Sequence, residues 1–227
     1  MHFVIEHSPG VFFLKDNGSS LLATRNMTPG RTVYGERLIT ADDIEYRLWN
    51  PSRSKLGAAI VNGLKNNPIV PGSWVLYLGV ASGTTCSHVS DIVGPKGHVL
   101  GVDFAQRPIR DFIDNVVNYR PNITPILADA RRPQTYSLQV PKVDVIFADV
   151  AQPDQAKIVE VNAKFFLKRG GYSMLSIKSR SIDVSRSPQD IYSEQVDVLV
   201  KAGHRIMELI ELEPFEKDHA LVVSSFL

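Results

Sequence analysis

The sequence of 227 residues predicts an α/β protein whose sheet is mostly parallel and is preceded by a small β-rich region. From residue 73 onward, short apolar runs alternate with helical stretches, as in parallel strands that are buried on both faces. The last two apolar runs, residues 205–210 and 220–226, are joined by a segment too short for a crossover helix. We therefore expect these two strands to be antiparallel.

The N-terminal part contains short β-type runs that are broken by hairpin turns. The turn sequence Asp16-Asn17-Gly18-Ser19 is one of them, because asparagine and glycine adopt positive φ at little cost. Turn residues around Pro51 end this part, and we expect a helix to begin near Ser54. The predicted domains are residues 1–52, which are β-rich, and residues 53–227, which are α/β. The predicted N-terminal strands are residues 3–5, 11–14 and 21–24.

In the second domain, ligands are expected beyond the carboxyl ends of the strands, as in other open α/β sheets. Candidate chemistry is therefore sought directly after each apolar run. The predicted strands are residues 75–78, 99–102, 123–127, 143–147, 172–177, 205–210 and 220–226. The residues that follow the first five are Gly79, Asp103, Asp129, Asp149 and Lys178.

Residues 74–85 are typical of a strand, a glycine turn and the start of a helix, and Asp103 follows the next strand. This order of parts builds a site for a cofactor that carries a nucleoside. Glycines let the backbone approach the ligand, and a carboxylate accepts hydrogen bonds from two ribose hydroxyls.

The glycine spacing favours S-adenosyl-L-methionine over a dinucleotide. The turn is G-x-x-x-G from Gly79 to Gly83, and Ala81 stands where a dinucleotide fingerprint has its second glycine. S-adenosyl-L-methionine has an adenosine to hold but no phosphate. The alternative is that the two glycines only shape a tight turn. The hydroxyl groups around the turn belong to Ser82, Thr84 and Thr85.

The composition excludes several classes of protein. The net charge is only +1, so no global basic field would bind nucleic acid independently. Cys86 is the single cysteine, which excludes an intramolecular disulfide and a cysteine-based zinc site, and we expect no metal. The chain begins without the pattern of a signal peptide and has no run long enough to span a bilayer. We therefore expect a cytoplasmic protein.

Several segments taken together resemble fibrillarin in its archaeal form, which lacks the glycine/arginine-rich tail. The resemblance spans the whole chain, including the β-rich N-terminal part. It implies a Rossmann-like class I S-adenosyl-L-methionine-dependent methyltransferase fold, and methylation of RNA ribose at the 2′-hydroxyl in rRNA and tRNA. The segments are residues 79–85, 149–153, 167–172, 178–183 and 217–220.

The resemblance also implies partners, because members of this family act within a box C/D ribonucleoprotein. These partners are a Nop5-type scaffold protein, an L7Ae-type RNA-binding protein, a box C/D guide RNA and the substrate RNA. The guide would select the modified nucleotide by base pairing, so this sequence does not encode it. Arginines near the expected rim are candidate phosphate contacts. They are Arg53, Arg131, Arg132, Arg180 and Arg186.

The catalytic set of the family maps onto Lys55, Asp149, Lys178 and His219. Two positions depart from the family pattern: Asp103 stands where glutamate is common, and Ala148 replaces an acidic neighbour of the catalytic aspartate. The first departure shortens the reach to the ribose by one methylene, and neither removes a catalytic residue. The predicted cofactor-binding residues are Gly79, Ala81, Gly83, Thr84, Thr85, Asp103, Phe104, Asp129, Ala130, Asp149 and Gln152.

The chemistry of the reaction independently favours these roles. A ribose hydroxyl is a poor acid, so its methylation needs in-line positioning and a group that accepts the proton or stabilises the developing alkoxide. Lys178 is the candidate for that group, with Asp149 to orient it, Lys55 to balance charge and His219 to complete the set. Taken singly, each residue has an ordinary alternative: a solvated lysine, a turn histidine, or an aspartate that caps the helix after Pro153.

The same residues disfavour other activities. Methylation of a base amino group normally uses an Asn/Asp-Pro-Pro-aromatic turn, whereas this turn is Asp149-Val150-Ala151-Gln152. Methylation of a pyrimidine carbon needs a nucleophilic cysteine, yet Cys86 lies in the predicted cofactor helix. The missing central glycine disfavours a nicotinamide dehydrogenase. A scaffold subunit that keeps the fold without turnover stays open as the alternative.

Overall fold

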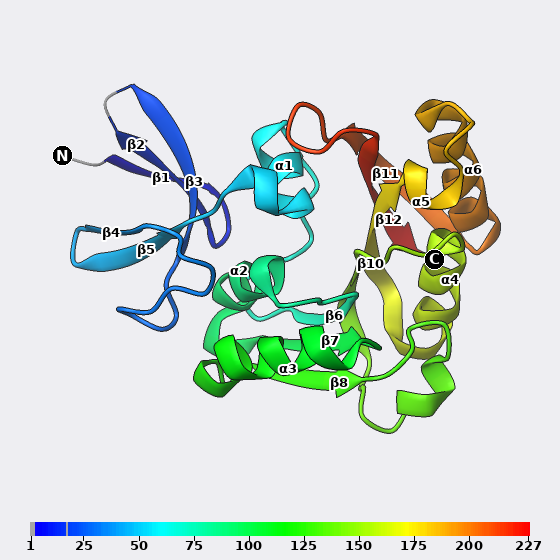
Figure 1. Cartoon of the computed structure of the whole chain (residues 1–227), viewed down its shortest axis with the longest axis horizontal. Helices are drawn as coiled ribbons and strands as arrows, with labels where there is room; N and C mark the ends of the chain where they lie inside the picture. The colour runs from blue at the N-terminus through cyan, green and yellow to red at the C-terminus, as the bar shows by residue number, and fades with distance from the viewer. Residues whose placement is uncertain (1–2, 17) are drawn as a thin grey trace.

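A computed structural model describes residues 3–16 and 18–227, and it contains two β-sheets (Figure 1). The N-terminal sheet is antiparallel and has five strands in the order β1-β2-β3-β5-β4. Asn17, in the expected turn between β2 and β3, lies outside the described residues. The strands are β1 (Phe3–Ser8), β2 (Val11–Asp16), β3 (Ser19–Arg25), β4 (Leu38–Ala41) and β5 (Ile44–Leu48).

The hairpin of β4 and β5 was not predicted from the sequence. Its two connecting residues, Asp42 and Asp43, both have positive φ, at 50° and 59°. A type I′ turn requires positive φ at both of its central residues, and it is usually recognised by an Asn-Gly or Asp-Gly pair. Two consecutive aspartates lack the glycine that would have identified the turn.

The second sheet has seven strands in the order β11-β12-β10-β9-β6-β7-β8. Its strands are parallel except β12, which is antiparallel to both neighbours. The predicted antiparallel pairing of the last two strands is confirmed, and β12 lies between β10 and β11. The strands are β6 (Trp74–Leu78), β7 (His98–Asp103), β8 (Ile123–Leu127), β9 (Val143–Ala148), β10 (Leu167–Lys178), β11 (His204–Glu211) and β12 (His219–Phe226).

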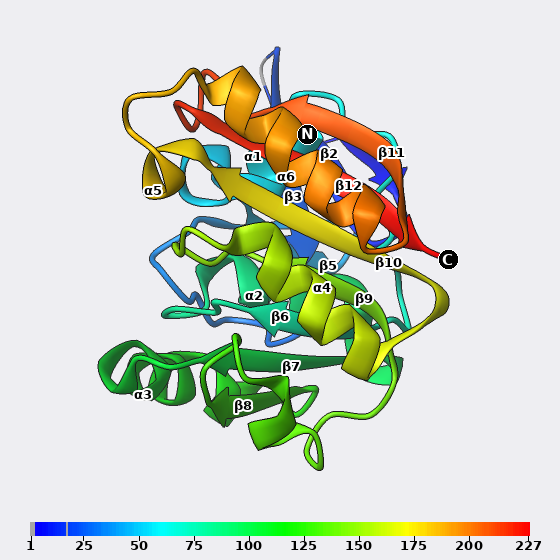
Figure 2. The same ribbon diagram turned by 90° about the vertical axis from the view of Figure 1, so that its right-hand side faces the viewer.

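Helices cover both faces of this sheet, as predicted for buried parallel strands (Figures 1 and 2). One core packs α1, α2 and α3 against side chains such as Tyr77 and Phe147, and the other packs α4 and α6 against side chains such as Leu76 and Ile146. None of the described helices has the length and apolar character needed to cross a membrane. The helices are α1 (Lys55–Val61), α2 (Thr84–Val93), α3 (Gln106–Asn115), α4 (Gln155–Phe166), α5 (Ser179–Ile182) and α6 (Pro188–Lys201).

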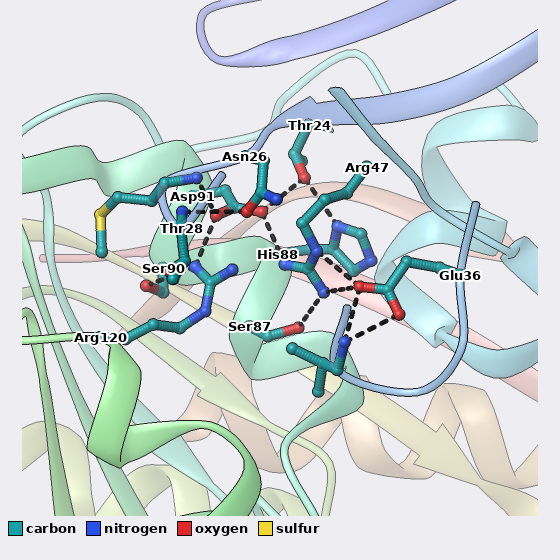
Figure 3. A network of polar contacts seen from close by, with 12 residues as sticks. Thr24, Asn26, Thr28, Glu36, Arg47, Ser87, His88, Ser90, Asp91 and Arg120 are labelled. Atoms are coloured by element: carbon teal, nitrogen blue, oxygen red, sulfur yellow. Dashed lines mark hydrogen bonds and ion pairs between the residues drawn. The ribbon is translucent and has the colours of Figure 1, made fainter. Parts of the chain in front are cut away.

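A buried polar network joins the N-terminal sheet to α2 (Figure 3). Arg47 of β5 contacts Asp91 of α2 at 2.7 Å and Glu36 at 2.6 Å. Arg120 contacts the other oxygen of Asp91 at 2.5 Å. Two guanidinium groups therefore meet two carboxylates, so the buried charges balance. We call this set the Arg47 network, and its members are Thr24, Glu36, Arg47, Ser87, His88, Asp91 and Arg120.

His88 completes the network as a neutral side chain. Thr24 donates its hydroxyl hydrogen to Asp91 at 2.8 Å, so His88 Nδ1 donates to Thr24 Oγ1 at 2.7 Å. The Tyr34 hydroxyl lies 2.7 Å from His88 Nε2 and 3.2 Å from the Leu48 carbonyl, so its one hydrogen is shared between these two acceptors. Burial, reinforced by the nearby arginines, lowers the pKa of His88 well below its usual value. Both ring nitrogens are therefore satisfied without a charge.

Candidate active site and cofactor cleft

A cleft of about 330 Å³ opens at the carboxyl ends of the parallel strands. A hollow of about 180 Å³ adjoins it and shares Gly79, Ala81 and Asp149 with it. Gly83, Thr84 and Thr85 line only the adjoining hollow. The predicted site residues that line the cleft are Gly79, Ala81, Asp103, Phe104, Asp129, Ala130, Asp149, Gln152 and Lys178.

A larger hollow of about 530 Å³ lies between the N-terminal sheet and α1, lined by Tyr34, Trp49 and Phe215 among others. It contains none of the predicted catalytic or cofactor-binding residues. Size therefore does not identify the site, whereas the polar side chains at the strand ends do.

The glycines of the turn are required by close packing. A Cβ on Gly79 would lie 2.7 Å from the carbonyl oxygen of Asp149, and one on Gly83 would lie 2.3 Å from the ring of Phe112. Both glycines also have positive φ, at 81° and 88°. The turn at the end of β6 is thus pressed against the end of β9, which brings the loop and Asp149 together.

Asp103 fastens this turn to the end of β7. Its Oδ2 accepts a hydrogen bond from the Ala81 amide at 2.8 Å, and its Oδ1 accepts one from the Ala105 amide at 3.0 Å. Ala81 has a φ of 49°, a left-handed conformation that this hydrogen bond helps to hold. Each carboxylate oxygen has a second acceptor direction, so Asp103 is oriented and still able to accept from a ribose.

Asp129 is oriented in a similar way by a neighbour. Arg131 contacts both carboxylate oxygens, with Nε at 3.0 Å and Nη2 at 2.8 Å. This hydrogen-bonded pair lowers the pKa of Asp129, which stays ionised. The carbonyl of the next residue, Ala130, accepts from Asn162 at 2.8 Å. Arg131, expected as a phosphate contact, is therefore engaged with Asp129.

The side chains of Lys55, Asp149 and Lys178 form a compact cluster, which we call the Lys-Asp-Lys cluster. Lys178 Nζ lies 2.9 Å from Asp149 Oδ1 and donates to the Asp149 carbonyl at 3.0 Å. Lys55 Nζ lies 3.4 Å from the same Oδ1. Two ammonium groups thus share one carboxylate, and Glu216 Oε1 lies at 4.0 Å from Lys55. Their side chains are about one-sixth exposed.

The start of α1 places Lys55 at the cluster. Ser54 is the N-cap of α1, and its hydroxyl accepts from the Gly57 amide at 3.2 Å. The same hydroxyl accepts from Thr85 at the start of α2 at 2.9 Å. One serine therefore links the helix that carries Lys55 to the helix that follows the cofactor turn.

His219 lies beside Lys178 but does not bond to the cluster. The two residues are paired in the register of β10 and β12. His219 Nδ1 donates to the Lys217 carbonyl at 2.6 Å, so the main chain, and not the cluster, holds this end of the ring. The structure thus brings three of the four predicted catalytic residues into contact and places the fourth on the adjacent strand.

The alternative that Asp149 caps the following helix is wrong. The N-cap position of α4 is Asp154, and no side chain caps there. Asp149 instead faces the two lysines. Tyr77 is fully buried, and this burial is the main reason why its pKa is raised. The negative charge of Asp149 raises the pKa further, so this tyrosine stays neutral.

Several rim arginines already have partners within the chain. Arg180 Nε contacts Asp218 at 2.9 Å, which ties α5 to the loop before β12. Arg186 is paired with a glutamate of α6 at 2.5 Å, and Arg53 lies over the ring of Tyr34 at 4.9 Å. A phosphate would have to compete with these contacts.

Two residues near the cluster were not found from the sequence. Glu216 lies beside Lys55, and Gln155 hydrogen-bonds to the main chain of Lys178. Their partners lie far away along the chain, so no local spacing signals either contact. The sequence gives only a weak hint for Gln155, a polar residue at the start of a helix after the Pro153 turn.

Comparisons with known proteins agree with this architecture. The sequence profile of the family described as Fibrillarin matches residues 4–227. A fibrillarin-like rRNA/tRNA 2′-O-methyltransferase of Thermococcus gammatolerans is 58% identical over 216 residues, which is 95% of each chain. The protein of the same name from Pyrococcus horikoshii is 56% identical over 95% of this chain and 94% of its own.

Solved structures give the same result. A fibrillarin pre-rRNA processing protein of Methanococcus jannaschii superposes with a TM-score of 0.95 at 46% identity, covering 100% of this chain and 98% of its own. Aeropyrum pernix fibrillarin, solved with natively bound S-adenosyl-L-methionine, gives 0.90 at 47% identity, with coverages of 99% and 100%. A chain of a fibrillarin/Nop5p complex gives 0.86 at 35% identity, with coverages of 96% and 98%. The α/β fold is that of S-adenosyl-L-methionine-dependent methyltransferases, and the chain belongs to the fibrillarin family.

Proposed function

We propose that this chain methylates the 2′-hydroxyl of ribose in rRNA and tRNA, with S-adenosyl-L-methionine as the methyl donor. The observation that carries the proposal is the Lys-Asp-Lys cluster, which lies at the end of a cleft lined by the cofactor turn. The relatives that share this chain's full length bear the name of that activity.

The residues of the cleft suit the parts of this cofactor. Asp103 would accept from the two ribose hydroxyls, since each of its oxygens has an acceptor direction left. Asp129 and the Ala130 amide would bind the adenine edge, and the exposed ring of Phe104 would lie against the base. The proposed cofactor set is Gly79, Ala81, Gly83, Thr84, Thr85, Asp103, Phe104, Asp129, Ala130, Asp149 and Gln152.

The cluster supplies what the ribose hydroxyl needs. The bound cofactor contributes an electrophilic methyl group on a sulfonium. Lys178 takes the hydroxyl proton through its neutral amine form, or as an ammonium it stabilises the negative charge that develops on the 2′-oxygen. Asp149 holds Lys178 through two contacts, and Lys55 balances the charge of Asp149. His219 completes the catalytic set from the adjacent strand.

Substrate delivery requires partners. A net charge of +1 and arginines that are mostly paired internally provide little attraction for an RNA duplex at physiological salt. A Nop5-type scaffold is supported by the complex solved for a relative. An L7Ae-type protein and a box C/D guide RNA complete the particle, which would act on rRNA and tRNA in the cytoplasm of an archaeal cell. Residues 1–52 and 53–227 remain the proposed domains.

The test compares the purified chain with the assembled particle. We expect the purified chain to bind S-adenosyl-L-methionine yet to show weak RNA binding and little site-specific methylation. Addition of scaffold, L7Ae-type protein and guide RNA should restore both, measured as transfer of a labelled methyl group to one ribose.

Two outcomes would contradict the proposal in different ways. Efficient site-specific methylation by the chain alone would indicate a stand-alone RNA methyltransferase. Absence of transfer in a fully assembled particle that binds the cofactor would favour a scaffold subunit without turnover.

A further inference from the structure

Gln155, the first residue of α4, bonds to the main chain of Lys178 through both ends of its side-chain amide. Its Oε1 accepts from the Lys178 amide at 2.9 Å, and its Nε2 donates to the Lys178 carbonyl at 3.2 Å. Gln155 is 0% exposed. An amide that donates and accepts in this way reproduces the pair of hydrogen bonds that a neighbouring strand would make.

β10 lacks such a strand neighbour at this position. Its pairing with β9 ends at Leu175 opposite Ala148, whereas its pairing with β12 continues to Lys178 opposite His219. The N–H and C=O of one strand residue point toward the same side, and those of Lys178 point toward α4. Without Gln155 the Lys178 N–H would lose its acceptor, and the Lys178 carbonyl, which also stands at the start of α5, would lose its side-chain donor.

Fixing this main chain matters for the side chain that it carries. The Lys178 ammonium reaches both the carboxylate and the carbonyl of Asp149, at 2.9 Å and 3.0 Å. A lysine side chain is long and flexible, so its ammonium nitrogen can be placed accurately only if the main chain of the lysine is fixed. Misplacement by about 1 Å can cost up to about a hundredfold in rate.

We infer that Gln155 is a positioning residue for Lys178, an inference that rests on the proposed function. Gln155 does not line the cleft, so it acts through the lysine and not on the cofactor. Its loss should lower the rate of methyl transfer more than the affinity for S-adenosyl-L-methionine.

A purely structural role would be to hold the start of α4, and a second glutamine separates the two roles. Gln195 of α6 is 5% exposed, and its Oε1 accepts from the amide of Ala156, the second residue of α4. The same end of the same helix is thus held by two buried glutamines, of which Gln155 also bonds to Lys178. Gln195→Leu is therefore the matched control for Gln155→Leu.

The experiment uses the assembled particle, with labelled methyl transfer for kcat, calorimetry for cofactor affinity and thermal melting for the fold. Gln155→Leu should lower kcat about tenfold or more while the cofactor Kd changes by less than about threefold. Gln195→Leu should lower the melting temperature but keep kcat within about twofold of the wild type, because Lys178 keeps its two hydrogen bonds.

Gln155→Glu adds a readout that a structural role would not move. A protonated glutamic acid both accepts from the Lys178 amide and donates to its carbonyl, whereas the carboxylate only accepts. The kcat of Gln155→Glu relative to the wild type should therefore rise as the pH falls, and the ratio for Gln155→Leu should not. This variant also serves if Gln155→Leu does not fold.

Three outcomes would overturn the inference. Wild-type kcat in folded Gln155→Leu would show that Lys178 needs no such support, and an equal loss in Gln195→Leu would assign the effect to the helix. A ratio for Gln155→Glu that does not change across the ionisation of the introduced carboxyl would exclude the role of the second hydrogen bond. If the wild-type particle itself transferred no methyl group, the proposed function would fail first, and this inference with it.

Discussion

The Arg47 network and the Lys-Asp-Lys cluster are both built from charged side chains, yet they differ in burial and in how closely the charges are paired. In the network, the Arg47 and Asp91 side chains are 0% exposed, and two cations meet two carboxylates. In the cluster, each side chain is 15–16% exposed and two cations share Asp149. The network is a saturated set of contacts that joins the N-terminal sheet to α2. In the cluster the second carboxylate, Glu216, lies 4.0 Å from Lys55, so the two ammonium groups are less closely paired.

This difference predicts opposite consequences for stability and for activity. Removing a charge from the network leaves buried partners without a counter-charge, so the fold should suffer. The cluster side chains keep partial contact with water, so we expect the loss of one charge there to affect the chemistry more than the fold.

The largest effect is expected for Asp91→Ala. The substitution leaves Arg47 and Arg120 buried without their shared carboxylate. It should lower the free energy of unfolding by about 3–5 kcal/mol, measured by urea denaturation. Glu194→Ala, which breaks the exposed pair with Arg186, is the control and should cost less than about 1 kcal/mol. An equal loss of unfolding free energy in the two variants would show that the buried network contributes no more to stability than an exposed ion pair.

Lys178→Ala should have the next largest effect, on turnover. The rate in the assembled particle should fall about a hundredfold, since one preorganised charge or proton acceptor is lost at the reacting oxygen. Cofactor affinity, measured by calorimetry, should stay within a few fold. Lys157→Ala, on the exposed face of α4, provides the control. Wild-type turnover in folded Lys178→Ala would disprove the assignment.

Asp103→Ala should weaken the binding of S-adenosyl-L-methionine by about 1.5–3 kcal/mol, because a charge-assisted contact to the ribose is lost. Isothermal calorimetry on the folded variant measures this directly. Asp103→Glu, which keeps the carboxylate on a side chain one methylene longer, should retain most of the affinity. An unchanged Kd for Asp103→Ala would limit Asp103 to its observed role of holding the turn at Ala81.

The smallest effect concerns pH. His88 is neutral in the folded network, and its lowered pKa means that the unfolded chain binds one proton more below about pH 6.5. Stability should therefore be full above that pH and fall by about 1.4 kcal/mol per pH unit below it. His204, whose pKa burial lowers to about 4, contributes in the same direction.

The variant His88→Gln tests how much of this pH dependence of stability comes from His88. Glutamine can keep hydrogen bonds to Thr24 and Tyr34 but cannot titrate. Urea denaturation between pH 5 and 7.5 should show a shallower pH dependence of the unfolding free energy than in the wild type. An identical slope would show that His88 takes up no extra proton on unfolding.

The cluster was easier to predict from the sequence than the network. Parallel strands appear as apolar runs, and polar residues after such runs converge at one edge of the sheet, so Asp103, Asp149 and Lys178 could be found. The network has no comparable rule. Arg47 lies in a polar-looking strand, and its partner Asp91 is 44 residues further along the chain. In a sequence, a buried arginine cannot be told from a surface arginine. Only the fold shows that Asp91 lies beside Arg47.

The placement of β12 has a consequence for the order in which the molecule is made. Among the described strands, β11 pairs with β12 alone, and β12 also carries His219 to the side of Lys178. During synthesis, β11 therefore emerges before the strand with which it pairs. Until β12 follows, the edge of β10 that faces away from β9 also has no strand partner. β12, which follows both strands in the sequence, closes both gaps at once. The cofactor turn can form early in synthesis, but the complete catalytic set exists only after the C-terminal strand has inserted.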